Sequence, residues 1–199
     1  MISTVHQDLI AANISRHSNL NASEMAFFMT LLELRSLEKK KYLFRSGEVC
    51  RYDYFITKGC VKVCYTDKKG DERIINFAPE NSWVIDLESF LNNTPSSFYI
   101  QAVEDSEYFR ISQSGYRLLY QTVPQFKKFS SERWRYGFIG LQQRIQQIIS
   151  TTAEEKYQHF KTTHPGLEKR IPQKLMASYL GVTPDLMNRL RGKYATPLS

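Results

Sequence analysis

The sequence predicts an α+β protein with a β-barrel or jelly-roll, a long helix and a small helical domain, in that order. Residues 40–111 are rich in aromatic and β-branched residues and are interrupted by glycines, which is typical of a sandwich or barrel. A heptad pattern and a run of capped helical segments follow. The 199 residues are 42% hydrophobic, enough for a packed core. We expect boundaries at 1–123, 124–150 and 151–199.

The β region is divided by turn signals at Gly47, Gly59 and Gly70. The stretch 67–71 lies between two strand candidates and predicts a hairpin turn in which Gly70 takes a positive φ. The expected strands are Tyr42–Arg45, Tyr54–Thr57, Val61–Thr66, Arg73–Phe77, Trp83–Leu87, Phe98–Val103 and Tyr108–Ile111.

Helices are expected on both sides of this region. Ser23 is a candidate N-cap for a helix over Met25–Leu34, and Ser112 for one over Tyr116–Tyr120. Pro124 then predicts a break.

A long helix is expected from about residue 125 to 150. Its apolar residues recur at alternating spacings of four and three, which is a heptad seam. Such a seam favours pairing with a second copy across a two-fold axis, although a helix packed on its own domain fits about two heptads as well. The candidate dimerisation residues are Trp134, Phe138, Leu141, Ile145 and Ile148.

Positive charge is concentrated in the last third of the chain. Residues 1–123 contain 14 basic and 15 acidic residues, whereas residues 124–199 contain 13 basic and five acidic ones. The whole net charge of +7 therefore comes from the second part. This asymmetry indicates a polyanionic partner, with a solvated basic surface as the alternative.

After a helix over Ala153–Thr163, residues 171–193 have the pattern of two helices crossing at a tight turn, the helix-turn-helix. Ala177 is small where the helices would touch, and Gly181 would form the turn. Thr183 can cap the second helix, with Pro184 at its first position. The expected shared core is Met176, Leu180, Val182, Met187 and Leu190.

The second helix would expose a basic face. Arg and Asn suit base edges in the major groove, and Lys suits phosphate. We expect Arg189 to contact a base and Lys174 and Arg191 to contact phosphates, while a helical hairpin with a solvated face is the alternative. The candidate DNA-binding residues are Lys174, Thr183, Asp185, Asn188, Arg189, Arg191 and Lys193.

With these features, the whole chain resembles the Crp/Fnr family of bacterial regulators. The resemblance rests on Gly47-Glu48 and Gly59 in a cyclic-nucleotide-binding-type barrel, on the long helix, and on residues 171–173 and 177–184, which resemble the version common in Bacteroidetes. It implies a cytoplasmic homodimer on a two-fold-symmetric operator in double-stranded DNA, with half-sites about one helical turn apart. RNA polymerase is a further candidate partner.

The phosphate cassette departs from the family pattern. Members that bind cyclic AMP have a Gly-Glu pair and, about ten residues later, an Arg that neutralises the phosphate. Here Ile85 and Asp86 replace the pair and Ser96 replaces the Arg, so we expect no useful binding of cyclic AMP and no cofactor. A cation, a polar neutral ligand or an empty scaffold all remain open. The degenerate pocket would comprise Asp86, Glu88, Ser89, Ser96 and Ser97.

No metal or catalytic site is expected. Cys50, Cys60 and Cys64 lack the N-terminal partners of an iron–sulfur regulator, and buried free thiols are the simpler reading. The four histidines are scattered, and none lies in residues 40–111, which argues against a cupin-type enzyme. We see no secretion signal and no membrane span.

The alternative function is a dimeric barrel protein that binds an effector or partner and no longer reads DNA. In the family, a hairpin called the wing usually follows the recognition helix. Only residues 194–199 follow the expected second helix here, so this wing would be absent or truncated.

Overall fold

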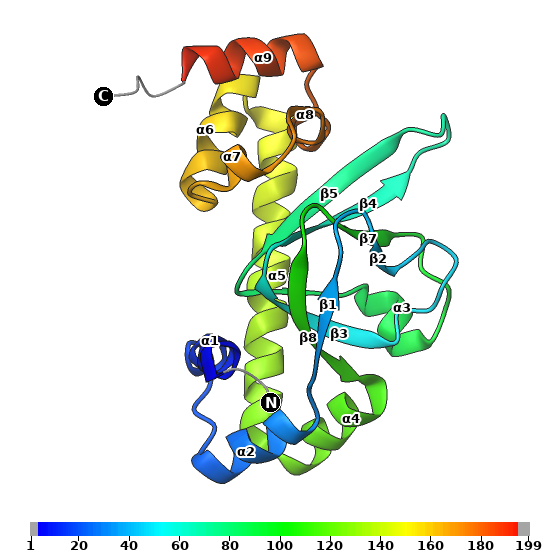
Figure 1. Cartoon of the computed structure of the whole chain (residues 1–199), viewed down its shortest axis with the longest axis vertical. Helices are drawn as coiled ribbons and strands as arrows, with labels where there is room; N and C mark the ends of the chain where they lie inside the picture. The colour runs from blue at the N-terminus through cyan, green and yellow to red at the C-terminus, as the bar shows by residue number, and fades with distance from the viewer. Residues whose placement is uncertain (1–3, 195–199) are drawn as a thin grey trace. The chain divides into compact units, whose positions relative to one another are not determined.

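The computed structural model describes residues 4–194, which form two compact units (Figure 1). The first unit contains residues 4–65 and 76–137, and the second contains residues 66–75 and 138–194. Within this range no helix is both long enough and apolar enough to cross a membrane.

Two four-stranded sheets form the centre of the first unit. Their strand orders are β1-β8-β3-β6 and β2-β7-β4-β5, so sequence-distant strands are neighbours, as in a jelly-roll. The two sheets are not closed into a barrel, so of the expected barrel or jelly-roll the structure has the jelly-roll. The strands are β1 Glu33–Leu37, β2 Tyr42–Phe44, β3 Tyr52–Lys58, β4 Cys60–Thr66, β5 Glu72–Pro79, β6 Ser82–Val84, β7 Tyr99–Ala102 and β8 Ser106–Ser112.

Two apolar clusters stabilise this unit. One fills the space inside the jelly-roll, with Ile56, Val61 and Ile100 fully buried. The other joins the outer face of β3 and β8 to helices, with Phe55 and Phe109 fully buried. The helices that contribute to the unit are α1 Thr4–Ser15, α2 Ala22–Thr30, α3 Leu87–Asn92, α4 Gln113–Thr122 and the beginning of α5 Pro124–Ser150.

Some local predictions are confirmed and others are corrected. Ser112 caps α4 by accepting a hydrogen bond from the amide of Gly115 at 3.1 Å, and Pro124 begins α5. Asn21, not Ser23, caps α2, because its side chain forms a capping box with Glu24. That helix ends at Thr30, and the expected helical residue Leu34 lies in β1 instead.

The strand expected over Trp83–Leu87 is shorter than predicted. It ends at Val84, and Leu87 already begins α3. The reason is Asp86, whose side chain accepts from the amide of Ser89 at 3.2 Å and so starts a helix.

The second unit is helical apart from the tip of the β4–β5 hairpin. Thr152 caps α6 through a capping box with Glu155. Tyr157, Phe160, Leu167 and Ile171 are buried beneath the last helices. The helices after α5 are α6 Ala153–Thr163, α7 Leu167–Arg170, α8 Gln173–Leu180 and α9 Pro184–Lys193.

Candidate functional site

In the predicted cassette, two of the side chains form a hydrogen bond with each other. The Ser96 hydroxyl donates to a carboxylate oxygen of Asp86 at 2.5 Å and accepts from the amide of Phe98 at 3.0 Å. The same Asp86 carboxylate caps α3. The two side chains thus satisfy each other through a hydrogen bond, and neither carries a positive charge.

The other cassette residues divide into a buried and an exposed group. Ser89 is buried, where its hydroxyl accepts from the amide of Cys50 at 2.8 Å and donates to the carbonyl of Thr94 at 2.6 Å. Glu88 and Ser97 are exposed. Of the five predicted cassette residues, Asp86 and Ser96 therefore lie in contact. Ser89 is used to link the backbone near Cys50 and Thr94.

A buried ion pair joins a sheet to α5 within the first unit. The Arg133 guanidinium donates to Asp53 on β3 at 2.6 Å, and the Asp53 side chain is 1% exposed. Burial raises the pKa of the Asp53 carboxyl, and the charge of Arg133 opposes that shift. Sequence reasoning missed the pair because its members are 80 positions apart.

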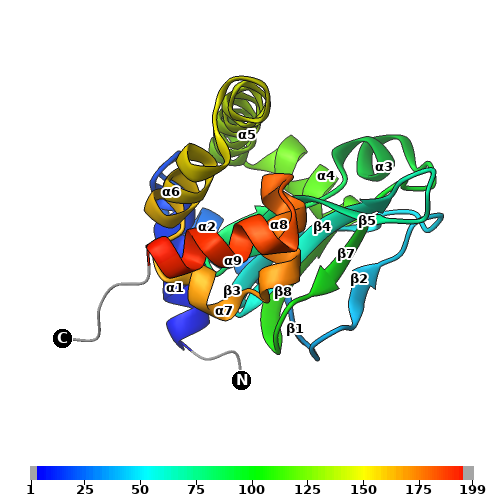
Figure 2. The ribbon, with the colours of Figure 1, turned by 90° about the horizontal axis from the view of Figure 1, so that it is seen from above.

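In the second unit, α8 and α9 meet at a tight turn (Figure 2). Gly181 ends α8 with φ of 70°, in the left-handed region, and the amide of Val182 donates to the carbonyl of Ala177 at 3.0 Å. Thr183 caps α9 by accepting from the amide of Leu186 at 3.3 Å, and Pro184 is its first residue.

The packing between α8 and α9 is largely the expected one. Five residues are buried at this junction, and the expected core residue Val182 is only half-buried, since it lies in the turn itself. The buried residues are Met176, Ala177, Leu180, Met187 and Leu190.

The candidate DNA-binding residues differ in their exposure and in whether another group already binds them. Lys174 and Arg189 are exposed and have no hydrogen-bond or ion-pair partner in the described part of the chain. Arg191 is half-buried and donates to the carbonyl of Glu168 at 2.8 Å, and Lys193 pairs with Glu154 at 2.7 Å.

The remaining candidates lie near the start of α9. Thr183 and Asp185 are exposed there, and Asn188 accepts a hydrogen bond from Gln173. The residues that bear on the expected wing, 195–199, lie outside the described residues.

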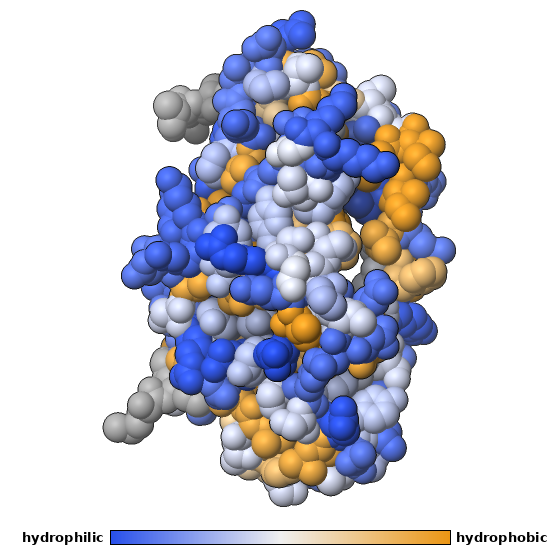
Figure 3. All heavy atoms as spheres, turned by 90° about the vertical axis from the view of Figure 1, so that its right-hand side faces the viewer, coloured by the Kyte–Doolittle hydropathy of each residue, from blue (hydrophilic) through white to orange (hydrophobic). Residues whose placement is uncertain are grey.

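Apolar side chains reach the surface in several patches (Figure 3). Four of them belong to the α5 seam: Phe138, Leu141, Ile145 and Ile148 are between 49% and 62% exposed. Trp134 is half-buried, and the central carbon of the Arg133 guanidinium lies 4.1 Å from the centroid of its ring. An exposed heptad stripe of this kind is typical of a helix that pairs with another helix.

The three cysteines are buried, and none of them forms a disulfide. Burial raises the pKa of the Cys50 thiol to about 11, which makes it a poor nucleophile and metal ligand. Among the described residues, no three or more His, Cys, Asp or Glu side chains are grouped so that they could hold a metal ion.

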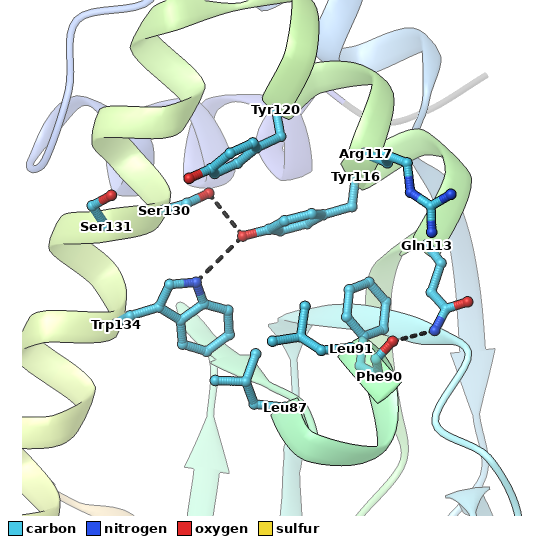
Figure 4. Close-up of a pocket in the computed structure, with 10 residues that line it drawn as sticks. All are labelled: Leu87, Phe90, Leu91, Gln113, Tyr116, Arg117, Tyr120, Ser130, Ser131 and Trp134. Carbon is cyan, nitrogen blue, oxygen red and sulfur yellow. Dashed lines mark hydrogen bonds between the residues drawn. The ribbon is translucent and has the colours of Figure 1, made fainter. Parts of the chain in front are cut away.

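A cavity that sequence reasoning missed lies between α3, α4 and the beginning of α5 (Figure 4). Its volume is about 350 Å³. The lining comes from three elements that are separated in sequence, so no local motif could reveal it. The lining residues are Leu87, Phe90, Leu91, Gln113, Tyr116, Arg117, Tyr120, Ser130, Ser131 and Trp134.

Comparisons with known proteins agree with this architecture. Residues 34–122 match the family model described as the cyclic nucleotide-binding domain. No curated protein matches the sequence. In fold, the chain is similar to the c-di-GMP responsive global regulator CLP from Xanthomonas campestris, with a TM-score of 0.69 and 14% identity over 88% of this chain and 92% of that one.

Two further structures are similar. A protein described as a transcriptional regulator of the Crp/Fnr family from Eubacterium rectale has a TM-score of 0.66 and 15% identity, over 88% of this chain and 84% of that one. The sensor domain of the regulator DNR from Pseudomonas aeruginosa has a TM-score of 0.56 and 25% identity, over 75% of this chain and 97% of its own. Residues 34–122 thus form a cyclic nucleotide-binding domain with a jelly-roll fold, and the structures similar in fold include one described as a Crp/Fnr-family regulator.

Proposed function

We propose that the chain is a transcriptional regulator of the Crp/Fnr type that binds double-stranded DNA through a helix-turn-helix formed by α8 and α9. The observation that carries this proposal is the junction of the two helices. Ala177 is buried at the contact, Gly181 makes the turn in the left-handed region, and Thr183 caps the second helix.

The exposed side chains of α9 support the same function. A recognition helix contacts base edges with its exposed side chains, and Arg189, in the middle of α9, is exposed and unpartnered among the described residues. Lys174, on α8, is likewise available for a phosphate. Arg191 and Lys193 have partners within the unit, so their role in phosphate binding requires those contacts to be exchanged.

Dimerisation through α5 belongs to the proposal. A two-fold-symmetric operator requires two recognition helices, and the exposed seam of α5 supplies an apolar surface for pairing. In this proposal the chain is divided into a sensor region, a dimerisation helix and a DNA-binding region. The regulators that are similar in fold support this division.

Cyclic AMP is not the effector in this proposal. The Ser96 hydroxyl stands where the family's phosphate-binding arginine would be, and it is bonded to Asp86. A phosphate in that position would be buried without a cation and next to a carboxylate, which costs several kcal/mol.

A mobility-shift assay with the promoter region upstream of the chain's own gene tests DNA binding. The parent should give a specific complex whose affinity falls steeply with salt. Arg189→Ala should remove the preference for the specific sequence over random DNA, whereas Lys174→Ala should weaken both equally and lower the salt slope by about one.

Lys128→Ala serves as the control, because Lys128 is an exposed lysine of the first unit. If all three variants bind specific and random DNA as the parent does, the assignment of α9 as the recognition helix is wrong. A chain that binds no DNA at all would instead be a dimer that recognises an effector or a partner.

A further inference from the structure

We propose that the cavity between α3, α4 and α5 binds a small apolar carboxylate, with the hydrocarbon inside and the carboxylate at Arg117. The cavity lies entirely within the first unit and shares no lining residue with the degenerate cassette. The proposal goes beyond DNA binding, because it concerns binding to this unit alone.

The size and the walls of the cavity suit a small organic molecule. Its volume of about 350 Å³ falls in the lower range of small-molecule sites. Leu87, Phe90 and Leu91 of α3 form one wall, and Tyr116 and Tyr120, whose rings stack 6.4 Å apart, form another (Figure 4). Carbon-rich walls of this kind favour an apolar or aromatic body.

Several polar side chains of the lining are hydrogen-bonded within the cavity wall. The Tyr116 hydroxyl donates to Ser130 at 2.9 Å and accepts from the Trp134 indole at 3.3 Å, and Figure 4 shows the three groups meeting there. The Gln113 amide donates to the carbonyl of Phe90. Because these groups satisfy one another, they contribute little to binding the polar end of a ligand.

The charge at the cavity selects an anion. None of the lining residues is acidic, and Arg117 is the only cation among them. Its guanidinium is exposed and has no hydrogen-bond or ion-pair partner in residues 4–194. Lys127 adds a second positive charge beside the wall, with its ammonium 5.5 Å from the centroid of Tyr120. A carboxylate is the group that a guanidinium binds with two parallel hydrogen bonds.

Calorimetry with a matched pair of probes tests this. The probes are 1-naphthylacetate and its neutral counterpart 1-naphthylacetamide, which share the aromatic body and differ in charge. The full chain should bind the acid saturably at one site per chain and roughly tenfold more tightly than the amide, because only the acid pairs with Arg117.

Three variants locate the binding. Arg117→Gln should lower the affinity for the acid to that for the amide, while Arg16→Gln, a matched change of an exposed arginine outside the cavity, should not. Ser131→Trp places a large ring at the mouth from an exposed position of α5 and should abolish binding of both probes, with an unchanged circular dichroism spectrum.

Several results would overturn the proposal. Equal affinity for the acid and the amide would exclude the carboxylate, and binding that survives Ser131→Trp would place the probes elsewhere. Binding that appears only after Leu141→Glu has separated the chains would show that a second copy covers the cavity. None of these results depends on whether the chain binds DNA.

Discussion

Arg133 on α5 donates a hydrogen bond to the carboxylate of Asp53 on β3 at 2.6 Å through Nη2. The other two guanidinium nitrogens, Nε and Nη1, are buried and have no hydrogen-bond partner. The guanidinium instead faces the rings of Trp83, at 4.6 Å, and Trp134, at 4.1 Å. A cation held in this way contributes through its charge and its contact with aromatic faces.

Removing one partner of this pair should be costly. Arg133→Met leaves the Asp53 carboxylate buried without a counter-charge and should lower the free energy of unfolding by about 3–5 kcal/mol, measured by urea denaturation. The double variant Asp53→Leu/Arg133→Met should recover most of that loss. Glu33→Gln, which breaks the exposed pair with Arg110, is the control and should cost less than about 1 kcal/mol.

The left-handed turn at Gly181 predicts a difference between two glycines of the same unit. Gly181→Ala should destabilise the protein by about 1 kcal/mol, because a Cβ disfavours a φ of 70°. Gly192→Ala, inside α9, should be stabilising by up to about 1 kcal/mol, since alanine favours helix and the space around that Cβ is open. Equal effects in thermal unfolding would contradict the assigned turn.

The Cys50 thiol should make stability depend on pH in the alkaline range. Its folded pKa is raised to about 11 from an ordinary 9.0, so the unfolded chain loses its proton first as the pH rises. The free energy of unfolding should therefore fall between pH 9 and 11, by about 2 kcal/mol in this window. Cys50→Ala should fall less steeply, and identical slopes for the two proteins would show that the thiol is not shielded.

The seam of α5 predicts the oligomeric state. Leu141→Glu places a charge in the exposed apolar stripe and should convert the proposed dimer to a monomer in sedimentation analysis, with an unchanged circular dichroism spectrum. Gln143→Glu adds the same charge on another face of the helix and should leave the dimer intact. A parent protein that is monomeric at micromolar concentration would remove the basis for a two-fold operator.

The closed cassette predicts the response to cyclic nucleotides. Cyclic AMP and cyclic GMP should leave the melting temperature unchanged, because the pair of Asp86 and Ser96 has no cation to offer the phosphate. A saturable increase with cyclic AMP would contradict this reading of Ser96.

Local patterns predicted the elements whose signals are local. The turn residues and β-branched runs indicated most strands, and the cap at Ser112, the break at Pro124 and the bounds of α6 are confirmed. Strand β1 was missed because Glu33–Leu37 has only one buried position and no aromatic or β-branched residue. Helix α1 was missed too, although Ile10 and Ile14 are buried four residues apart.

The features that depend on long-range packing could not be predicted in this way. Asp53 meets Arg133 across 80 positions, and the cavity unites α3, α4 and α5. Nothing in the immediate neighbours of Asp53 or Tyr116 distinguishes them from other polar residues of a strand or helix. Likewise, the replacement of the cassette arginine was visible, but the hydrogen bond that Ser96 makes instead required the fold.

The anchoring of α1 has a practical consequence for dissecting this chain. Asn13 accepts from the Trp83 indole at 2.9 Å and donates to Asn81, while Ile10 and Ile14 are fully buried. A fragment trimmed to the 34–122 range would lose that helix together with Phe126 and Phe129, and would leave the outer face of β3 and β8 uncovered. The smallest piece that can be expected to fold by itself therefore begins near residue 4 and extends into α5.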